Sequence, residues 1–163
     1  MMNKKMTELL NKQINEELFS SYLYLSMSAY FLTENLDGCA HWMKLQAQEE
    51  LNHAMKFFKY IDERGETIAL DKLAKPQAKW ASPLAAFEEA YKHEQKITAS
   101  IHAIMGAADE LKDYGTHQFL QWFIAEQIEE EDAADEIVQK LKMIGDSKGA
   151  LFQLDHQLAK RGE

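Results

Sequence analysis

The feature that most constrains this chain is an acidic stretch inside a helix-like apolar pattern. In FIAEQIEEEDAADEIV, residues 123–138, seven acidic side chains crowd around Gln127. Apolar residues on both sides, from Phe119 to Leu141, keep the spacing of one helix face. Such a face is normally buried, and an unpaired charge is costly there. A fold for this chain must therefore accommodate carboxylates on a buried helix face.

Helix breakers are rare in the sequence. Only two prolines and seven glycines interrupt 163 residues, and long stretches are rich in Ala, Glu, Lys, Leu and Gln. The hydrophobic content of 46% is enough for one sizeable core. The sequence predicts an all-α fold in a single domain spanning residues 1–163.

Periodicity and breakers predict five helices. Asn35–Gly38, Gly65 and Tyr114–Thr116 are expected at turns, and Ser82-Pro83 supplies an N-cap followed by a first-turn proline. The expected helices cover approximately residues 7–34, 39–64, 83–113, 116–144 and 147–160.

The segment 66–82 is expected to be a long crossover. About 16 extended residues reach at most about 50 Å, which exceeds the roughly 40 Å length of a 28-residue helix. A connection this long is unusual unless it must cross the whole domain. We therefore expect a four-helix bundle of two antiparallel hairpins with the crossover between helices two and three, and a short fifth C-terminal helix.

Each long helix carries a polar interruption in its apolar stripe. Counted from the hairpin turns, these interruptions lie at the same depth, and one offset of 77 residues relates the two hairpins. The interruptions are Glu17, then Glu50 with His53, then Glu94, then Gln127 with Glu130. The bundle should bring them together.

Four clustered carboxylates need either protons or cations. Repulsion between two close carboxylates costs about 4 kcal/mol at an effective dielectric of 20. Protonation of some of them, with raised pKa values, is one way to remove this repulsion. The other is two divalent ions, which would balance four carboxylates, with neutral His53 and Gln127 completing the set. Oxygen-rich ligation with one imidazole and no thiolate suits iron or manganese and admits zinc, whereas magnesium or calcium would not need the histidine.

Charge and cysteine usage exclude other classes. The net charge of −9 argues against a nucleic-acid or anionic-membrane surface. Cys39 is the only cysteine, so no disulfide framework or CxxC pair is expected, and a reducing cytoplasm is the expected compartment. Residues 18–32 are too short and too rich in serine for a membrane span, and the N-terminus does not read as a signal peptide.

These residues resemble ferritin, and more closely the non-haem bacterial ferritins, over the whole chain. Ferritin-like di-iron bundles generally take one Glu from each of two helices and an ExxH motif from each of the other two. This sequence has one ExxH, Glu50 to His53, and Gln127-Ile128-Glu129-Glu130 in place of the second. That departure resembles ferritin proper more than bacterioferritin or rubrerythrin. Asn52, where a bacterioferritin would offer a haem-ligating Met, implies that no haem is bound.

The resemblance implies a ferroxidase centre within a storage protein. Glu17, Glu50 and His53 would hold one iron, and Glu94, Glu130 and Gln127 the other, with Glu50 bridging. A third iron would lie at Glu49, Glu126, Glu129 and Glu130, and Tyr24 and Trp122 match aromatic positions that donate electrons. The implied reaction is oxidation of Fe(II) by dioxygen or hydrogen peroxide. The implied assembly is a homo-oligomeric cage of 24 subunits that stores ferric mineral.

Other interpretations stay open at this point. The chain could be a metal-free acidic helical module, with Glu49, Glu126 and Glu129 on a solvated face and Tyr24 and Trp122 in the core. A mini-ferritin would have its site between subunits and lack the fifth helix, and a peroxide-reducing rubrerythrin would usually add a CxxC domain. The other five histidines lack a partner at ligand spacing and are given no role.

Overall fold

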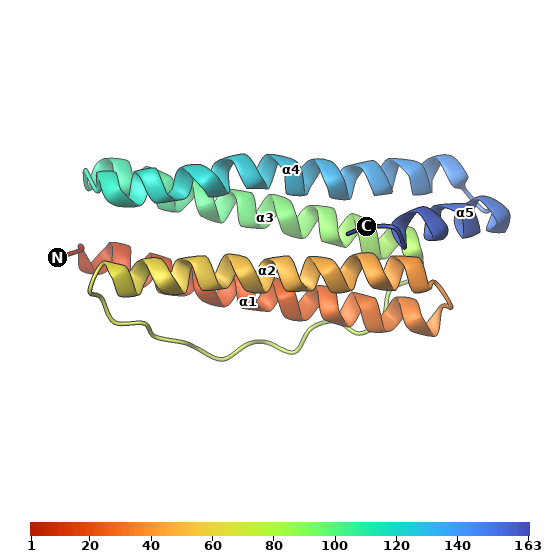
Figure 1. Cartoon of the computed structure of the whole chain (residues 1–163), viewed down its shortest axis with the longest axis horizontal. Coiled ribbons are helices and arrows are strands. Elements are labelled where there is room, and N and C mark those ends of the chain that lie inside the picture. The colour runs from red at the N-terminus through yellow and green to blue at the C-terminus, as the bar shows by residue number, and fades with distance from the viewer.

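The computed structural model describes residues 1–163, which form five helices and no strand. They are α1 (Lys4–Thr33), α2 (Asp37–Glu63), α3 (Pro83–Glu110), α4 (Tyr114–Ile144) and the short α5 (Lys148–Leu158). Helices α1 and α2 form one antiparallel hairpin and α3 and α4 another, while the crossover runs along the outside from one end to the other (Figure 1). This is the four-helix bundle with a long crossover that the sequence predicts.

Local chemistry sets the helix ends. The Ser82 side chain accepts a hydrogen bond from the Ala85 amide, as predicted for the start of α3. Helix α1 begins at Lys4, earlier than expected, because the Asn3 side chain caps it. Helix α3 ends at Glu110, earlier than expected, and Lys112 has a left-handed φ of 53° in the turn that follows.

The start of α2 is capped from a distant part of the chain. Leu36 at the N-cap offers no side-chain acceptor, and the Asp155 carboxylate of α5 accepts from the Cys39 amide at 2.7 Å instead. A carboxylate suits this position because the helix N-terminus is electropositive. Gly38 allows the close approach, since a Cβ there would lie 1.7 Å from the Asp155 carbonyl oxygen. Helix α5 is thereby docked on the end of α2.

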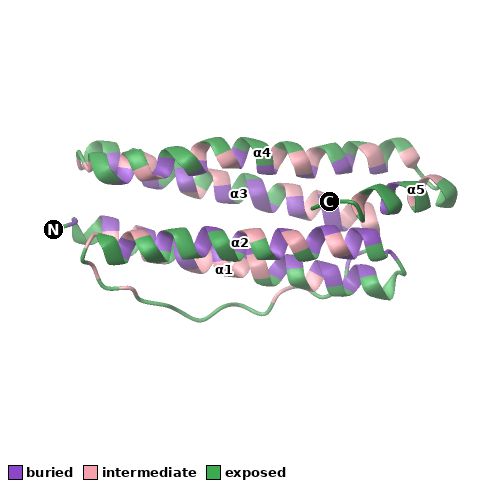
Figure 2. Cartoon of the chain, in the orientation of Figure 1, coloured by how far each residue is buried: buried purple, intermediate pink, exposed green.

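A polar layer divides the core into two hydrophobic clusters. One cluster, near the α1–α2 turn, includes Tyr24 and Phe87, and the other, at the opposite end, includes Ile14 and Phe57. Figure 2 shows buried residues along the facing sides of the four long helices and a mostly exposed crossover. Between the clusters lie the buried polar side chains of Glu17, Glu50, His53, Glu94, Gln127 and Glu130. The shared depth expected from the sequence is therefore present.

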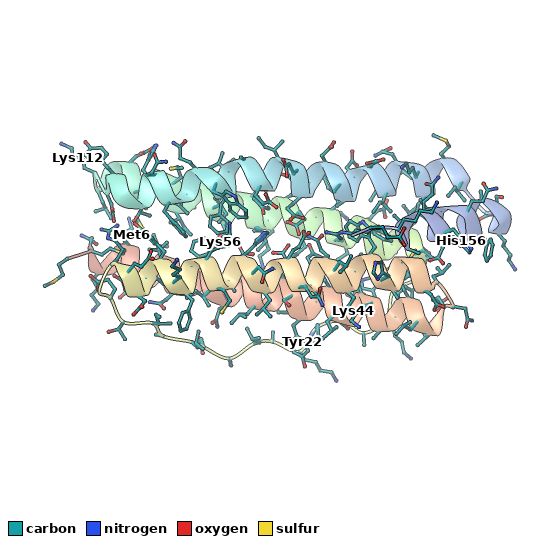
Figure 3. All side chains as sticks on the ribbon, viewed as in Figure 1. Met6, Tyr22, Lys44, Lys56, Lys112 and His156 are labelled. Carbon is teal, nitrogen blue, oxygen red and sulfur yellow. The ribbon has the colours of Figure 1, made fainter.

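Five of the fourteen exposed large apolar side chains lie on α1 and on the crossover. Tyr22 of α1 lies on the side of the bundle that faces the crossover (Figure 3). These five are Tyr22, Leu25, Leu32, Leu70 and Leu73. No helix of the chain combines the length and the apolar character that a membrane crossing requires.

Candidate metal centre

All four long helices contribute to one buried layer of potential ligands. Glu17 comes from α1, Glu50 and His53 from α2, Glu94 from α3, and Gln127 and Glu130 from α4. Ligand atoms lie within 4.8 Å of one another in three overlapping groups, and two of these, Glu17–Glu50–His53 and Glu50–Glu94–Glu130, lie wholly within this layer. Because Glu50 belongs to both groups, it lies between two candidate cation positions.

Hydrogen bonds fix Glu94 from two sides. The Tyr24 hydroxyl donates to one carboxylate oxygen, and the Gln127 amide donates to the other at 3.1 Å. Two buried oxygens, Glu17 Oε2 and Gln127 Oε1, have no hydrogen-bond partner. Buried polar atoms are rarely left unpaired, and both of these oxygens belong to the ligand layer. A bound cation would give each of them a partner.

Burial shifts the acid–base properties of the layer. It raises the pKa of Glu17 to about 7 and that of Glu130 to about 8, with the charge of Glu94 adding to the effect at Glu130. Burial and the same charge raise the pKa of Glu50 well above its usual range. Burial, with the nearby Lys56 ammonium, lowers the pKa of His53 to about 4, so its imidazole is neutral at pH 7. Cations entering this layer would displace protons from the carboxyls.

Two buried glutamines that sequence reasoning missed support the carboxylates. The Gln13 amide donates to Glu17 at 3.0 Å, and the Gln46 amide donates to Glu50 at 3.1 Å and to Glu130 at 2.6 Å. Each glutamine lies four residues before a glutamate of the layer on the same helix face. That spacing was the available signal. Hydrogen bonds of this kind commonly orient metal-binding carboxylates.

The comparison with known proteins shows the family. Residues 7–144 match the Ferritin-like domain. The chain belongs to the ferritin family. It is 42% identical to the bacterial non-heme ferritin of Bacteroides fragilis, over 99% of this chain and 100% of that protein. It is 39% identical to the bacterial non-heme ferritin of Campylobacter jejuni, over 97% of this chain and 95% of that protein.

A solved ferritin structure has the same fold. The open pore ferritin from the hyperthermophilic archaeon Archaeoglobus fulgidus superposes with a TM-score of 0.98 at 49% identity, covering 99% of each chain. The expected family and the expected ferritin-like fold are therefore confirmed.

The outer acids of this ferritin are less uniformly arranged than the sequence implied. Glu126 lies 3.9 Å from His53 Nε2, and both share a candidate group with Glu130. Glu49 instead forms an ion pair with Arg161 at 3.0 Å, and Glu129 is exposed. None of the candidate groups includes Glu49 or Glu129.

Trp122 lies between solvent and the ligand layer. Its ring meets the His53 imidazole edge-on at 5.4 Å, and the Lys56 ammonium lies 3.1 Å from its centroid. Figure 3 shows Lys56 between α2 and α4. The indole is 41% exposed, so it is not a core residue.

His93, which was given no role, is buried beside the layer without joining it. Its Nε2 lies 2.7 Å from the Ser20 hydroxyl oxygen, and its ring packs edge-on against Tyr24. Burial, together with Lys96, lowers the pKa of His93 to about 4. A neutral His93 packs the outer side of the Tyr24 ring.

Proposed function

We propose that the chain, as one ferritin-like domain of residues 1–163 in a reducing cytoplasm, is the subunit of an iron-storage protein with ferroxidase activity. The observation that carries this proposal is the buried layer of four carboxylates, one neutral imidazole and one amide, with two oxygens left unpaired. The relatives named bacterial non-heme ferritin support it. A surface of solvated acids would not bury its charges in this way.

The two overlapping groups divide the layer between two Fe(II) ions, which are the substrate. Glu17, Glu50 and His53 hold the first. Glu50, Glu94 and Glu130 hold the second, and the unpaired Gln127 carbonyl oxygen completes it. Hard carboxylate oxygens favour Fe(III) over Fe(II), so the same ligands promote oxidation. Every ligand comes from one chain, which counts against a mini-ferritin with a site between subunits.

The reaction transfers one electron from each iron. Two Fe(II) ions and two protons convert dioxygen to hydrogen peroxide, and a second pair with two more protons reduces hydrogen peroxide to water. The Tyr24 hydroxyl donates a hydrogen bond to a Glu94 oxygen, and burial keeps the pKa of Tyr24 well above its usual range. We place Tyr24 beside the second iron as a local electron donor, which would give dioxygen one electron in place of an iron and pass its hydroxyl proton to Glu94.

Glu126 and Glu129 are predicted to bind a third iron together with Glu130. Glu49 would join them once its ion pair with Arg161 is broken. Replacing Glu126 and Glu129 with Gln keeps side-chain size while removing two charges. We expect the first two irons per subunit to oxidise at a nearly normal rate, because the inner ligands are intact. The dioxygen consumed per iron in later additions should change, which oximetry measures. A double variant that matches the parent through every addition would make these acids a solvated face only.

The exposed apolar side chains of α1 and the crossover predict assembly. Exposed apolar side chains in this number often mark a contact between proteins, and we propose that they are covered in a closed 24-subunit cage. Sedimentation under native conditions should give a mass of about 24 times the 18.8 kDa subunit. Only monomers or dimers would contradict the storage function, because neither encloses a mineral.

A further inference from the structure

The C-terminal tail folds back onto α2 through a single arginine. The Arg161 guanidinium donates to the Trp42 carbonyl and to the Gln46 side-chain oxygen, both at 2.9 Å, and lies 4.4 Å from the Trp42 ring. It also forms the ion pair with Glu49. In return, the His41 ring nitrogen donates to the Arg161 carbonyl at 2.9 Å. The tail is therefore anchored at one point on α2.

That point connects directly to the ligand layer. Gln46 is buried, and its amide nitrogen donates to Glu50 and Glu130. A continuous hydrogen-bonded path thus leads from Arg161 through Gln46 to two carboxylates that we assign to the second iron. One of them, Glu50, also serves the first iron.

The guanidinium determines which way the Gln46 amide faces. Arginine has only donors, so it requires the amide oxygen on its own side and leaves the NH₂ group for the carboxylates. A flipped amide would set oxygen against Glu50 and Glu130, and NH₂ against Arg161. When cations neutralise the carboxylates, their hold on the NH₂ group weakens. Arg161 then remains to keep the amide oxygen away from the metal.

We propose that Arg161 is a positioning residue of the metal centre, acting through Gln46 to hold Glu50 and Glu130 in their binding geometry. This inference rests on the proposed function. It makes the docked C-terminal segment part of the centre, although no residue of that segment is a ligand. The tail would control how well each subunit binds its second cation.

The test is anaerobic titration of metal-free protein with Co(II), whose visible spectrum reports coordination as well as occupancy. We expect Arg161→Ala to lower the affinity for the second Co(II) about tenfold, which is in the range known for groups that hydrogen-bond to metal ligands. The visible bands of that Co(II) should also change. Gln46→Met should have an effect at least as large. The double variant should bind no more weakly than Gln46→Met alone, because both changes break one path.

The direction of the change in Co(II) affinity distinguishes a positioning role of Arg161 from a purely electrostatic one. Removing a cation near an acidic site strengthens cation binding if only electrostatics acts, so the predicted weakening is opposite. Lys160→Ala removes an exposed positive charge next to Arg161 in the tail and should leave the affinity for the second Co(II) unchanged. Arg161→Gln, which retains much of the side-chain length, should reproduce the weakening even if Arg161→Ala disturbs the tail.

Two results would overturn the proposal. One is Co(II) binding in both Arg161 variants that equals or exceeds that of the parent. The other is additive losses in the double variant. A parent protein that binds no pair of Co(II) ions would instead defeat the proposed function, so the two failures are distinguishable.

Discussion

Glu50→Ala is expected to abolish rapid Fe(II) oxidation while the helical bundle stays folded. Glu50 belongs to both of the groups that we assign to the two inner irons, so its loss removes a ligand from each of these irons. His53→Ala should have the same effect through the first iron alone. We expect the initial rate to fall by roughly 100-fold or more, because losing a partner of a ligand already costs about 10- to 100-fold. The helices should persist, since removing a repelled buried carboxylate relieves the metal-free core.

Stopped-flow absorbance after mixing with Fe(II) in air measures this rate. Glu63→Ala is a matched control, because Glu63 lies on the same helix and its only ion pair is the exposed one with Lys59. The control should oxidise iron like the parent. Unchanged rapid oxidation in both Glu50→Ala and His53→Ala would place the chemistry elsewhere.

The second large effect concerns the stability of the metal-free protein. Glu17 and Glu130 have a usual pKa of 4.5, which burial raises to about 7 and about 8 in the folded state. Between about pH 5 and pH 8 the folded state therefore binds more protons than the unfolded state. The free energy of unfolding must then fall as pH rises through this window. The loss should be on the order of a few kcal/mol per subunit, since each pKa unit corresponds to about 1.4 kcal/mol.

A variant isolates this contribution from other titrating groups. Glu17→Gln combined with Glu130→Gln keeps the side-chain shapes but cannot ionise. In the presence of a chelator, the melting temperature of this double variant should match that of the parent near pH 5. Toward pH 8 it should exceed that of the parent by an increasing margin. Zn(II) should raise the melting temperature of the parent at pH 8 far more than that of the variant. A difference between the two proteins that does not change with pH would contradict the assignment.

The main ligands were predictable because a bundle converts sequence spacing into position. Glu17 and Glu94 interrupt apolar stripes at equal depth, and packed helices leave few ways to arrange them. Gln13 and Gln46 were missed because a glutamine side chain is neutral. A neutral amide on a helix flank does not by itself indicate a charged partner in the way that a buried carboxylate does. Their spacing of four residues before Glu17 and Glu50 held the information.

The contacts of the C-terminal segment were not predictable in the same way. Asp155 caps a helix that begins more than a hundred residues earlier, and no periodicity links the two. Arg161 lies in the turn that follows α5, where its backbone amide donates to the Leu158 carbonyl, and its guanidinium reaches Glu49. The expected ligand Glu49 was therefore assigned without its partner. Tertiary folding of the tail, which helical periodicity does not describe, decides that contact.

The most direct test of a dinuclear iron centre is an anaerobic Fe(II) titration of the metal-free protein, followed by air. The two groups that share Glu50 predict that two Fe(II) per subunit bind tightly, ahead of the third at the outer acids, and that both are oxidised rapidly when dioxygen enters. Glu50→Ala should show neither the saturation nor the rapid phase. Fewer than two tightly bound Fe(II) per subunit in the parent, or a titration that Glu50→Ala leaves unchanged, would contradict the account.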